Sequence, residues 1–335
     1  MSLTRRFALA ALSATLLPAP AALAQPDPLP SWNQGLGKHT LLAFIARVTR
    51  EGGPDYVPPA ERIAVFDNDG TLWAEQPSYF QFQFALDRTK ALAPQNPAWQ
   101  DRPAFRAIVA GDAKALSALS HKDVQEILAI SHAGMTTEAF ARTVAEWLAT
   151  ARHPRFGQPY DQLVYQPQLE LLAHLRASGF KTFIVSGGGV EFIRVFAEKA
   201  YGVPPEQVVG SSVVVKLQMA TDGKAELVKQ AQVEFVDDGP GKPVGINRFI
   251  GRRPIIAFGN SDGDHQMLQW TAAGSGPRLM AILHHTDAIR EWAYDRTSQI
   301  GRLDKALDEA NDRGWTVIDM RRDWKWVFPF QRQVP

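Results

Sequence analysis

The chain has 335 residues and no cysteine. Disulfide bonds and thiolate zinc sites are therefore excluded. It also has no excess of charge of either sign, since 36 Lys and Arg stand against 35 Asp and Glu. This balance argues against a dedicated nucleic-acid-binding protein, which would carry a basic surface. A chain of this length can bury a sizeable core without covalent cross-links.

Long apolar runs are also missing, except near the N-terminus. Arg5 and Arg6 precede a mostly apolar stretch over 7–17, which is too short to span a bilayer. Small residues at Ala22-Leu23-Ala24 predict a signal peptide over 1–24 that is cleaved after Ala24. We expect an exported protein, periplasmic or secreted, with no membrane span in its mature part. The general secretory and twin-arginine routes both remain open.

Two carboxylates follow an apolar, β-prone segment at 63–66. Asp67 and Asp69 stand there in the run Asp67-Asn68-Asp69-Gly70-Thr71. Ligand sites in open α/β sheets lie at the carboxyl ends of strands. Gly70 allows the chain to turn, so both acids can converge on one site. Crowded carboxylates repel each other unless a cation or a shared proton holds them, which predicts Mg²⁺ together with a nucleophile and an acid/base.

A calcium loop is the alternative for this run, because hard cations favour closely spaced oxygen ligands. An EF-hand requires a bidentate Glu twelve residues into the loop, and that position is Ser78. A strand rather than a helix is expected before the loop. Both features favour the catalytic interpretation.

The Asp67-Asn68-Asp69-Gly70-Thr71 run resembles the first motif of haloacid dehalogenase superfamily phosphatases. Three further motifs of that family are matched in order: an apolar run into Ser186-Gly187-Gly188-Gly189, a lysine at Lys242, and an apolar run into 259–264. Lys216, Lys224 and Lys229 are rivals for the lysine, but Lys242 precedes an expected helix at 244–250. The resemblance covers roughly residues 60 to 290.

The resemblance implies roles for these residues. Asp67 would be the nucleophile that forms an aspartyl-phosphate, and Asp69 the general acid/base. Ser186, Lys242 and the loop at Gly187 would hold the phosphoryl group. The Asp67 carboxylate and the Asp69 backbone carbonyl would bind Mg²⁺. Related dehalogenases lack the second Asp, so Asp69 favours phosphate ester hydrolysis.

The fourth motif departs from the family pattern. Many relatives have Asp directly after the glycine, whereas this chain has Asn260. An amide oxygen can bind Mg²⁺ without contributing negative charge. Asp262 and Asp264 are available to compensate, one as a ligand and the other through contacts to the ligands. The sequence leaves the choice among these three residues open.

The predicted fold is α/β, with a Rossmann-like parallel sheet and an inserted α-helical cap domain similar to that of the phosphoserine phosphatase-like branch. The core would comprise 25–75 and 165–335, and the cap 76–164. Apolar spacing in the insert is helical without strand alternation. A single helix is expected over 190–199, and a hairpin that pairs 213–219 with 227–235.

Substrate choice would lie with the cap and the residues after the first motif. Trp73 and Glu75 lead toward the cap, and Glu75 with nearby aromatics could hold an alkylammonium group. These aromatics could instead pack the junction between cap and core, which is the favoured interpretation. Arg102 could meet a second anionic group, or it could simply be solvated.

The sequence thus predicts an exported, Mg²⁺-dependent phosphomonoesterase acting on small organic phosphates. A phosphotransferase or phosphonatase with the same nucleophile is the enzymatic alternative. A protein that binds metal or phosphate with little turnover is the other, and Asn260 supports it. The sequence sets neither the natural substrate nor the oligomeric state.

Overall fold

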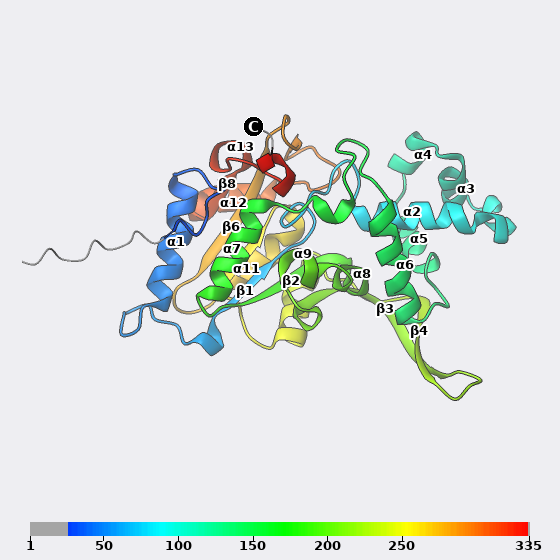
Figure 1. Ribbon diagram of the computed structural model, residues 1–335, viewed down its shortest axis with the longest axis horizontal. Coiled ribbons are helices and arrows are strands. Elements are labelled where there is room, and N and C mark those ends of the chain that lie inside the picture. The colour runs from blue at the N-terminus through cyan, green and yellow to red at the C-terminus, as the bar shows by residue number, and fades with distance from the viewer. Residues whose placement is uncertain (1–25, 334–335) are drawn as a thin grey trace, which may run out of the picture.

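The computed structural model describes residues 26–333. The predicted signal peptide over 1–24 lies outside the described residues. A mixed sheet forms the centre, helices cover both of its faces, and further helices extend to one side (Figure 1). The predicted α/β class is therefore confirmed.

The sheet has eight strands in the order β4-β3-β2-β1-β5-β6-β7, and β8 pairs with β6. Pairing is parallel from β3 to β6 and for β8, while β4 and β7 run antiparallel to their neighbours. The antiparallel pairs are additions to the predicted parallel sheet. The strands are β1 (Ile63–Phe66), β2 (Lys181–Gly189), β3 (Val208–Met219), β4 (Ala225–Phe235), β5 (Ile256–Gly259), β6 (Leu279–Thr286), β7 (Ala293–Tyr294) and β8 (Thr316–Asp319).

Strand β1 is buried along its whole length because both faces of the sheet are covered. Its side chains alternate between two apolar cores, as strand geometry requires. Ala64 and Phe66 join one core, and Ile63 and Val65 join the other. This burial places the end of β1, where Asp67 begins, deep in the molecule.

Each core is closed by its own helices. Helices α1, α7, α8 and α9 contribute to the core that contains Phe66, while α11 and α12 contribute to the one that contains Val65. The helices outside the insert are α1 (Leu36–Thr49), α7 (Gln166–Ala177), α8 (Val190–Arg194), α9 (Ala197–Tyr201), α10 (Gly241–Gly245), α11 (His265–Ala272), α12 (Lys305–Arg313) and α13 (Met320–Asp323).

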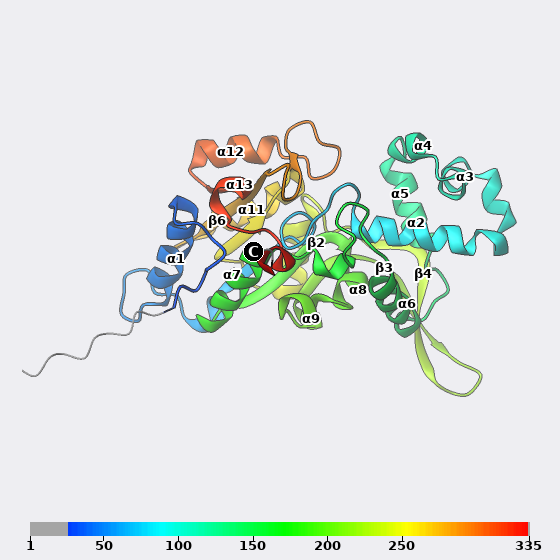
Figure 2. The same cartoon turned by 45° about the horizontal axis from the view of Figure 1, so that its top comes forward.

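Between β1 and α7 the chain forms a run of helices, which we call the helical segment. Its members are α2 (Phe80–Leu92), α3 (Pro103–Ala110), α4 (Ala113–Ser117), α5 (His121–Ile130) and α6 (Thr137–Thr150). Helices α2 to α5 stand away from the sheet and enclose a small core of their own (Figure 2). The helical content agrees with the sequence pattern. That the segment acts as a separate cap domain stays a prediction.

The β3–β4 hairpin reaches the helical segment, and β4 packs against α5 and α6. The hairpin itself was predicted from the turn at Thr221-Asp222-Gly223, and the observed pairing confirms it. Its packing was not predicted, because nothing in the local sequence shows what a long hairpin will contact.

Two helices differ from the sequence prediction. The expected helix over 190–199 is broken into α8 and α9, because Phe196 leaves helical geometry and stacks on Trp73 at 4.4 Å between ring centroids. The helix expected at 244–250 begins earlier, at Gly241. Lys242 therefore lies inside its first turn, not before it.

Candidate active site

The first motif forms a tight loop directly after β1. The backbone N–H of Asp67 donates to the carbonyl of Phe258 in β5 at 2.9 Å. Gly70 has φ +74°, which favours glycine. A Cβ at this position would also collide with the side chains of Asn260 and Glu75. The turn at Gly70 was predicted, and this close approach gives a second reason for glycine.

Lys242 lies between two carboxylates at the centre of the site. Its Nζ is 2.5 Å from Asp67 Oδ1 and 2.6 Å from Asp264 Oδ1, and it donates to the Val185 carbonyl at 3.0 Å. Burial opposes the charge on Lys242, but the two carboxylates outweigh it and raise the lysine pKa. Burial, followed by the nearby Asp264 carboxylate, raises the pKa of Asp67 well above its usual value. Lys242 and its carboxylate partners are therefore held in fixed positions away from solvent.

Asp69 is held by Trp73. The indole Nε1–H donates to Asp69 Oδ1 at 2.7 Å. Trp73 itself is buried by stacking on Phe196 and by an edge contact with Phe80. Burial raises the pKa of Asp69, and the hydrogen bond from Trp73 works against that rise. Trp73 thus orients the second carboxylate, and it packs between Phe80 of α2 and Phe196, in agreement with the favoured interpretation that these aromatics pack the junction.

In the fourth motif, Asp264 and Asn260 face the site. Asp264 Oδ2 accepts from the backbone N–H groups of Asn260 at 2.9 Å and Ser261 at 3.1 Å, which leaves Oδ1 for Lys242. The Asn260 side chain accepts from Thr71 Oγ1 at 3.1 Å and donates to Glu75 Oε1 at 2.7 Å. The fourth motif is therefore joined directly to the first.

Asp262 is not brought to the site. Its Oδ1 accepts from the backbone N–H groups of Asp304 at 3.0 Å and Ala306 at 2.9 Å, at the start of α12. The first N–H groups of a helix have no partner within the helix, and Asp262 satisfies them. It does not line the cavity that contains Asp67. Of the two residues predicted to compensate for Asn260, only Asp264 therefore faces the site.

Glu75 is fully buried and already has partners. Its Oε1 accepts from Asn260 Nδ2 and from Tyr294 Oη, each at 2.7 Å. Burial raises the pKa of Glu75 to about 8. Glu75 also lines the cavity, so its contact with a substrate ammonium stays a prediction.

The second motif lies at the end of β2. Ser186 is buried, and its Oγ accepts from the Gly188 backbone N–H at 3.0 Å. Gly187 lines the cavity beside Asp238, whereas Ser186 does not. The Gly189 N–H donates to Gln81 Oε1 of α2 at 2.6 Å, which joins this loop to the helical segment.

The structure also places the other candidates. Arg102 pairs with Glu126 and lies 4.3 Å from the centre of the Phe105 ring, within the helical segment and outside the cavity. The structure therefore does not bring Arg102 to the site. Among the rival lysines, Lys224 pairs with Asp222 in the hairpin turn and Lys229 pairs with Glu191. Lys242 is the lysine that contacts Asp67.

A cavity of about 970 Å³ opens over these groups. Of the residues predicted from sequence, Asp67, Asp69, Glu75, Gly187 and Lys242 line it. Trp73, Ser186, Asn260 and Asp264 support the lining residues from behind. The cavity therefore exposes the paired carboxylates and the lysine to a ligand.

Four residues that sequence reasoning missed belong to this site: Asp238, His285, Glu291 and Tyr294. His285 Nε2 bonds the Gly70 carbonyl at 2.7 Å, and its Nδ1 lies 3.0 Å from Glu291 Oε2. Burial lowers the pKa of His285, but the Glu291 carboxylate outweighs it and raises the pKa. Asp238 lines the cavity. In the sequence, the adjacent acidic pair Asp237-Asp238 could have indicated Asp238 as a site residue, whereas no pattern marks His285.

Several oxygen donors suit a hard cation here. They are the Asp67 carboxylate, the Asp69 backbone carbonyl and the Asn260 amide, and Mg²⁺ prefers oxygen ligands. Burial disfavours the charged carboxylates of Asp67 and Asp69 and raises their pKa values, and a bound cation would stabilise the charged forms. Within residues 26–333, no three His, Cys, Asp or Glu side chains gather as a metal cluster. The donor set fits Mg²⁺ through backbone and amide oxygens.

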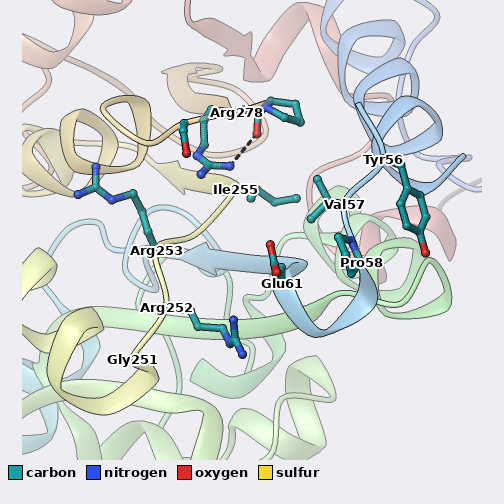
Figure 3. Close-up of a pocket in the computed structure, with 12 residues that line it drawn as sticks. Tyr56, Val57, Pro58, Glu61, Gly251, Arg252, Arg253, Ile255 and Arg278 are labelled. Atoms are coloured by element: carbon teal, nitrogen blue, oxygen red, sulfur yellow. Dashed lines mark hydrogen bonds between the residues drawn. The ribbon is translucent and has the colours of Figure 1, made fainter. Parts of the chain in front are cut away.

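A second cavity, of about 450 Å³, lies at the opposite end of the sheet (Figure 3). Its lining includes Val57 and Glu61, which precede β1, and Arg253 and Ile255, which precede β5. These are the amino ends of the strands. The cavity is therefore separate from the site at their carboxyl ends.

Several solved structures are similar to this chain, and the first of those below supports the fold. A conserved protein of unknown function from Anaerococcus prevotii has a TM-score of 0.51 at 15% identity, covering 82% of this chain and 88% of that one. A protein of unknown function from Bordetella pertussis has a TM-score of 0.48 at 17% identity, covering 78% of this chain and 99% of that one. A phosphoserine phosphohydrolase-like protein from Francisella tularensis has a TM-score of 0.36 at 19% identity, covering 67% of this chain and 87% of that one.

No curated protein sequence matches the chain. A family model described as haloacid dehalogenase-like hydrolase matches residues 64–269, more than half of the chain. The match spans the first motif, the helical segment, Lys242 and the fourth motif. The chain belongs to the haloacid dehalogenase-like hydrolases.

Proposed function

We propose that this hydrolase is an exported, Mg²⁺-dependent phosphomonoesterase that acts on small organic phosphates. The observation that carries the proposal is Lys242 Nζ, 2.5 Å from Asp67, with Asp69 beside them in one cavity. A nucleophilic carboxylate, a fixed cation and a second carboxylate are the groups that phosphoryl transfer through an enzyme-bound acyl phosphate requires.

Asp67 is the nucleophile in this proposal. One of its carboxylate oxygens attacks phosphorus, and the bond from phosphorus to the ester oxygen breaks. The product is an aspartyl-phosphate on Asp67. Lys242 stabilises the negative charge around the transferring group, because it is buried and held by Asp264 on its other side.

Asp69 moves the proton. In the first step the protonated Asp69 carboxyl donates to the departing alkoxide, and burial, which raises the Asp69 pKa, helps it to hold that proton. The ionised Asp69 then accepts a proton from water, whose oxygen attacks the aspartyl-phosphate and releases phosphate. Trp73 keeps Asp69 in one orientation through both steps. Bound at Asp67, the Asp69 carbonyl and Asn260, Mg²⁺ would supply further charge stabilisation for the phosphoryl oxygens.

The test is phosphate release from p-nitrophenyl phosphate with Mg²⁺ or with EDTA, by the wild type, Asp67→Asn and Asp101→Asn. Asp101 is exposed and lies outside the cavity, so it controls for the loss of one carboxylate. We expect Mg²⁺-dependent release by the wild type and by Asp101→Asn, and none by Asp67→Asn. Activity of Asp67→Asn, with deamidation excluded by mass, would disprove the nucleophile.

The same assay separates the alternatives. Transfer of phosphate to added alcohols in preference to water would indicate a phosphotransferase, and cleavage of C–P bonds a phosphonatase. Phosphate binding without turnover across several metals would indicate a binding protein. Among residues 26–333, no helix has the length and apolar character needed to cross a bilayer. Export rests on the N-terminal pattern, and a mature protein that begins at Gln25 would support it.

A further inference from the structure

The cavity over Asp67 is larger than a phosphate site requires. Its volume of about 970 Å³ lies at the upper end of the roughly 300–1,000 Å³ that pockets for drug-sized ligands occupy. Asp67, Asp69 and Lys242 line one part of it, where the phosphoryl group would be bound. The rest must accommodate the remainder of the substrate.

That remainder faces apolar side chains. On α2, Phe82 and Leu86 lie one turn apart and both line the cavity. On α5, Val124 and Leu128 repeat this spacing, and Leu116 and Leu119 complete the wall. We call this group, Phe82, Leu86, Leu116, Leu119, Val124 and Leu128, the apolar arm. It lies on the part of the helical segment that stands away from the sheet (Figure 2).

The cationic side chains near this part of the cavity either have an ion-pair partner or carry no charge. Lys229 pairs with Glu191 and lies 4.5 Å from the centre of the Phe140 ring. Burial lowers the pKa of His132 to about 3, so this side chain carries no charge at neutral pH. Arg102 pairs with Glu126 outside the cavity. A second anionic group on the substrate would therefore find no free cation among these side chains.

We infer that the substrate is a phosphate monoester whose alcohol carries an extended, uncharged apolar group, which the apolar arm binds. This inference rests on the proposed phosphatase function and specifies its substrate class. Burying the apolar group removes it from water, which is favourable in proportion to the area covered. Short polar esters such as a phosphorylated amino acid would leave the arm empty.

The test compares straight-chain monoalkyl phosphates from ethyl to octyl, each below the concentration at which it forms micelles. Burial of one CH₂ contributes about 0.8 kcal/mol, so kcat/KM should rise by up to about fourfold per methylene until the arm is filled. A kcat/KM that stays level or falls from ethyl to octyl would overturn the inference.

Val124→Thr tests the arm itself, because it replaces a methyl with a hydroxyl of similar size. An apolar chain against this hydroxyl should lower the octyl-to-ethyl ratio of kcat/KM by about five- to tenfold. Val109→Thr is the matched control, since Val109 is 41% exposed on α3 and lies outside the cavity. Equal ratios in both variants would contradict the assignment of Val124.

Calorimetric titration of the wild type with ethyl and hexyl phosphate, in EDTA, tests binding without turnover. Burial of apolar surface makes the heat capacity of binding more negative, so hexyl phosphate should show the larger change. This titration distinguishes a failure of the proposed phosphatase function from a failure of the substrate inference. If no ester is hydrolysed while binding still strengthens with chain length, the phosphatase function fails and the apolar arm stands. Binding affinity and heat capacity that do not change with chain length would disprove the role of the apolar arm, whether or not the esters are hydrolysed.

Discussion

At the scale of single residues, Trp73 links packing to chemistry. Replacing Trp73 with Phe keeps an aromatic ring against Phe196 but removes the N–H that donates to Asp69. A hydrogen bond of this kind contributes about 1–2 kcal/mol, so we expect kcat to fall about tenfold with little change in KM. Trp326→Phe is the control, because within residues 26–333 its indole N–H has no partner. Equal kcat values in the two variants would contradict the positioning role.

Asp237 gives a second residue-scale prediction, on stability. Its carboxylate is buried and, among the described residues, has no hydrogen-bond partner, and burial raises its pKa to about 7 from 3.8. A raised carboxyl pKa leaves stability intact below pH 3.8 and removes it as pH rises toward 7. Asp237→Asn lacks this loss, so its stability relative to wild type should grow by about 3 kcal/mol between pH 5 and pH 8. Denaturant unfolding at both pH values measures the difference, and a constant difference would refute the shift.

At the scale of elements, Asp262 connects the fourth motif to α12. Asp262→Ala removes an acceptor for two backbone N–H groups, so we expect a loss of about 1–2 kcal/mol in unfolding free energy. The Mg²⁺ concentration for half-maximal activity should stay unchanged. Asp312→Ala, an exposed change near the other end of α12, is the control for stability. A higher Mg²⁺ requirement in Asp262→Ala would instead make Asp262 a ligand.

The loop of the fourth motif shows which site residues can be predicted from the sequence and which cannot. Asp67, Ser186 and Asn260 were found because each follows an apolar strand, and parallel strands bring their carboxyl ends to one edge. Asp262 could not be separated from Asp264, because the two stand two residues apart in one loop. The direction of Asp262 depends on backbone N–H groups at the start of α12, which lie 42 and 44 residues further along the chain. A local pattern carries no information about that contact.

At the scale of the whole molecule, the missed residues come from segments that follow the matched motifs. His285 and Tyr294 lie on β6 and β7, and Glu291 lies between these strands. They meet the first motif through Gly70 and Glu75, more than 200 residues earlier in the chain. Only the closure of the sheet brings them together. The motif order fixed the candidate nucleophile and lysine, whereas the groups that hold them required the tertiary structure.

The molecule divides its core unequally, and this has a measurable consequence. The sheet is enclosed by two large apolar clusters, but α2 to α5 share a smaller one whose buried members, among the described side chains, are Ala85, Leu86, Phe105, Ile108 and Ile127. Regions with fewer buried contacts open at lower free energy. We therefore expect backbone amides over 97–130 to exchange with deuterium at least tenfold faster than those of β1 and β5. Mass spectrometry of exchanged peptides measures this directly, with α11, a helix of the sheet layer, as the control for helical amides. Because the apolar arm lies on these helices, hexyl phosphate should slow their exchange more than that of α11. Equal protection of α3, α5 and α11 in the free protein would mean that the helical segment is as firmly packed as the sheet, and its small core would then not limit its stability.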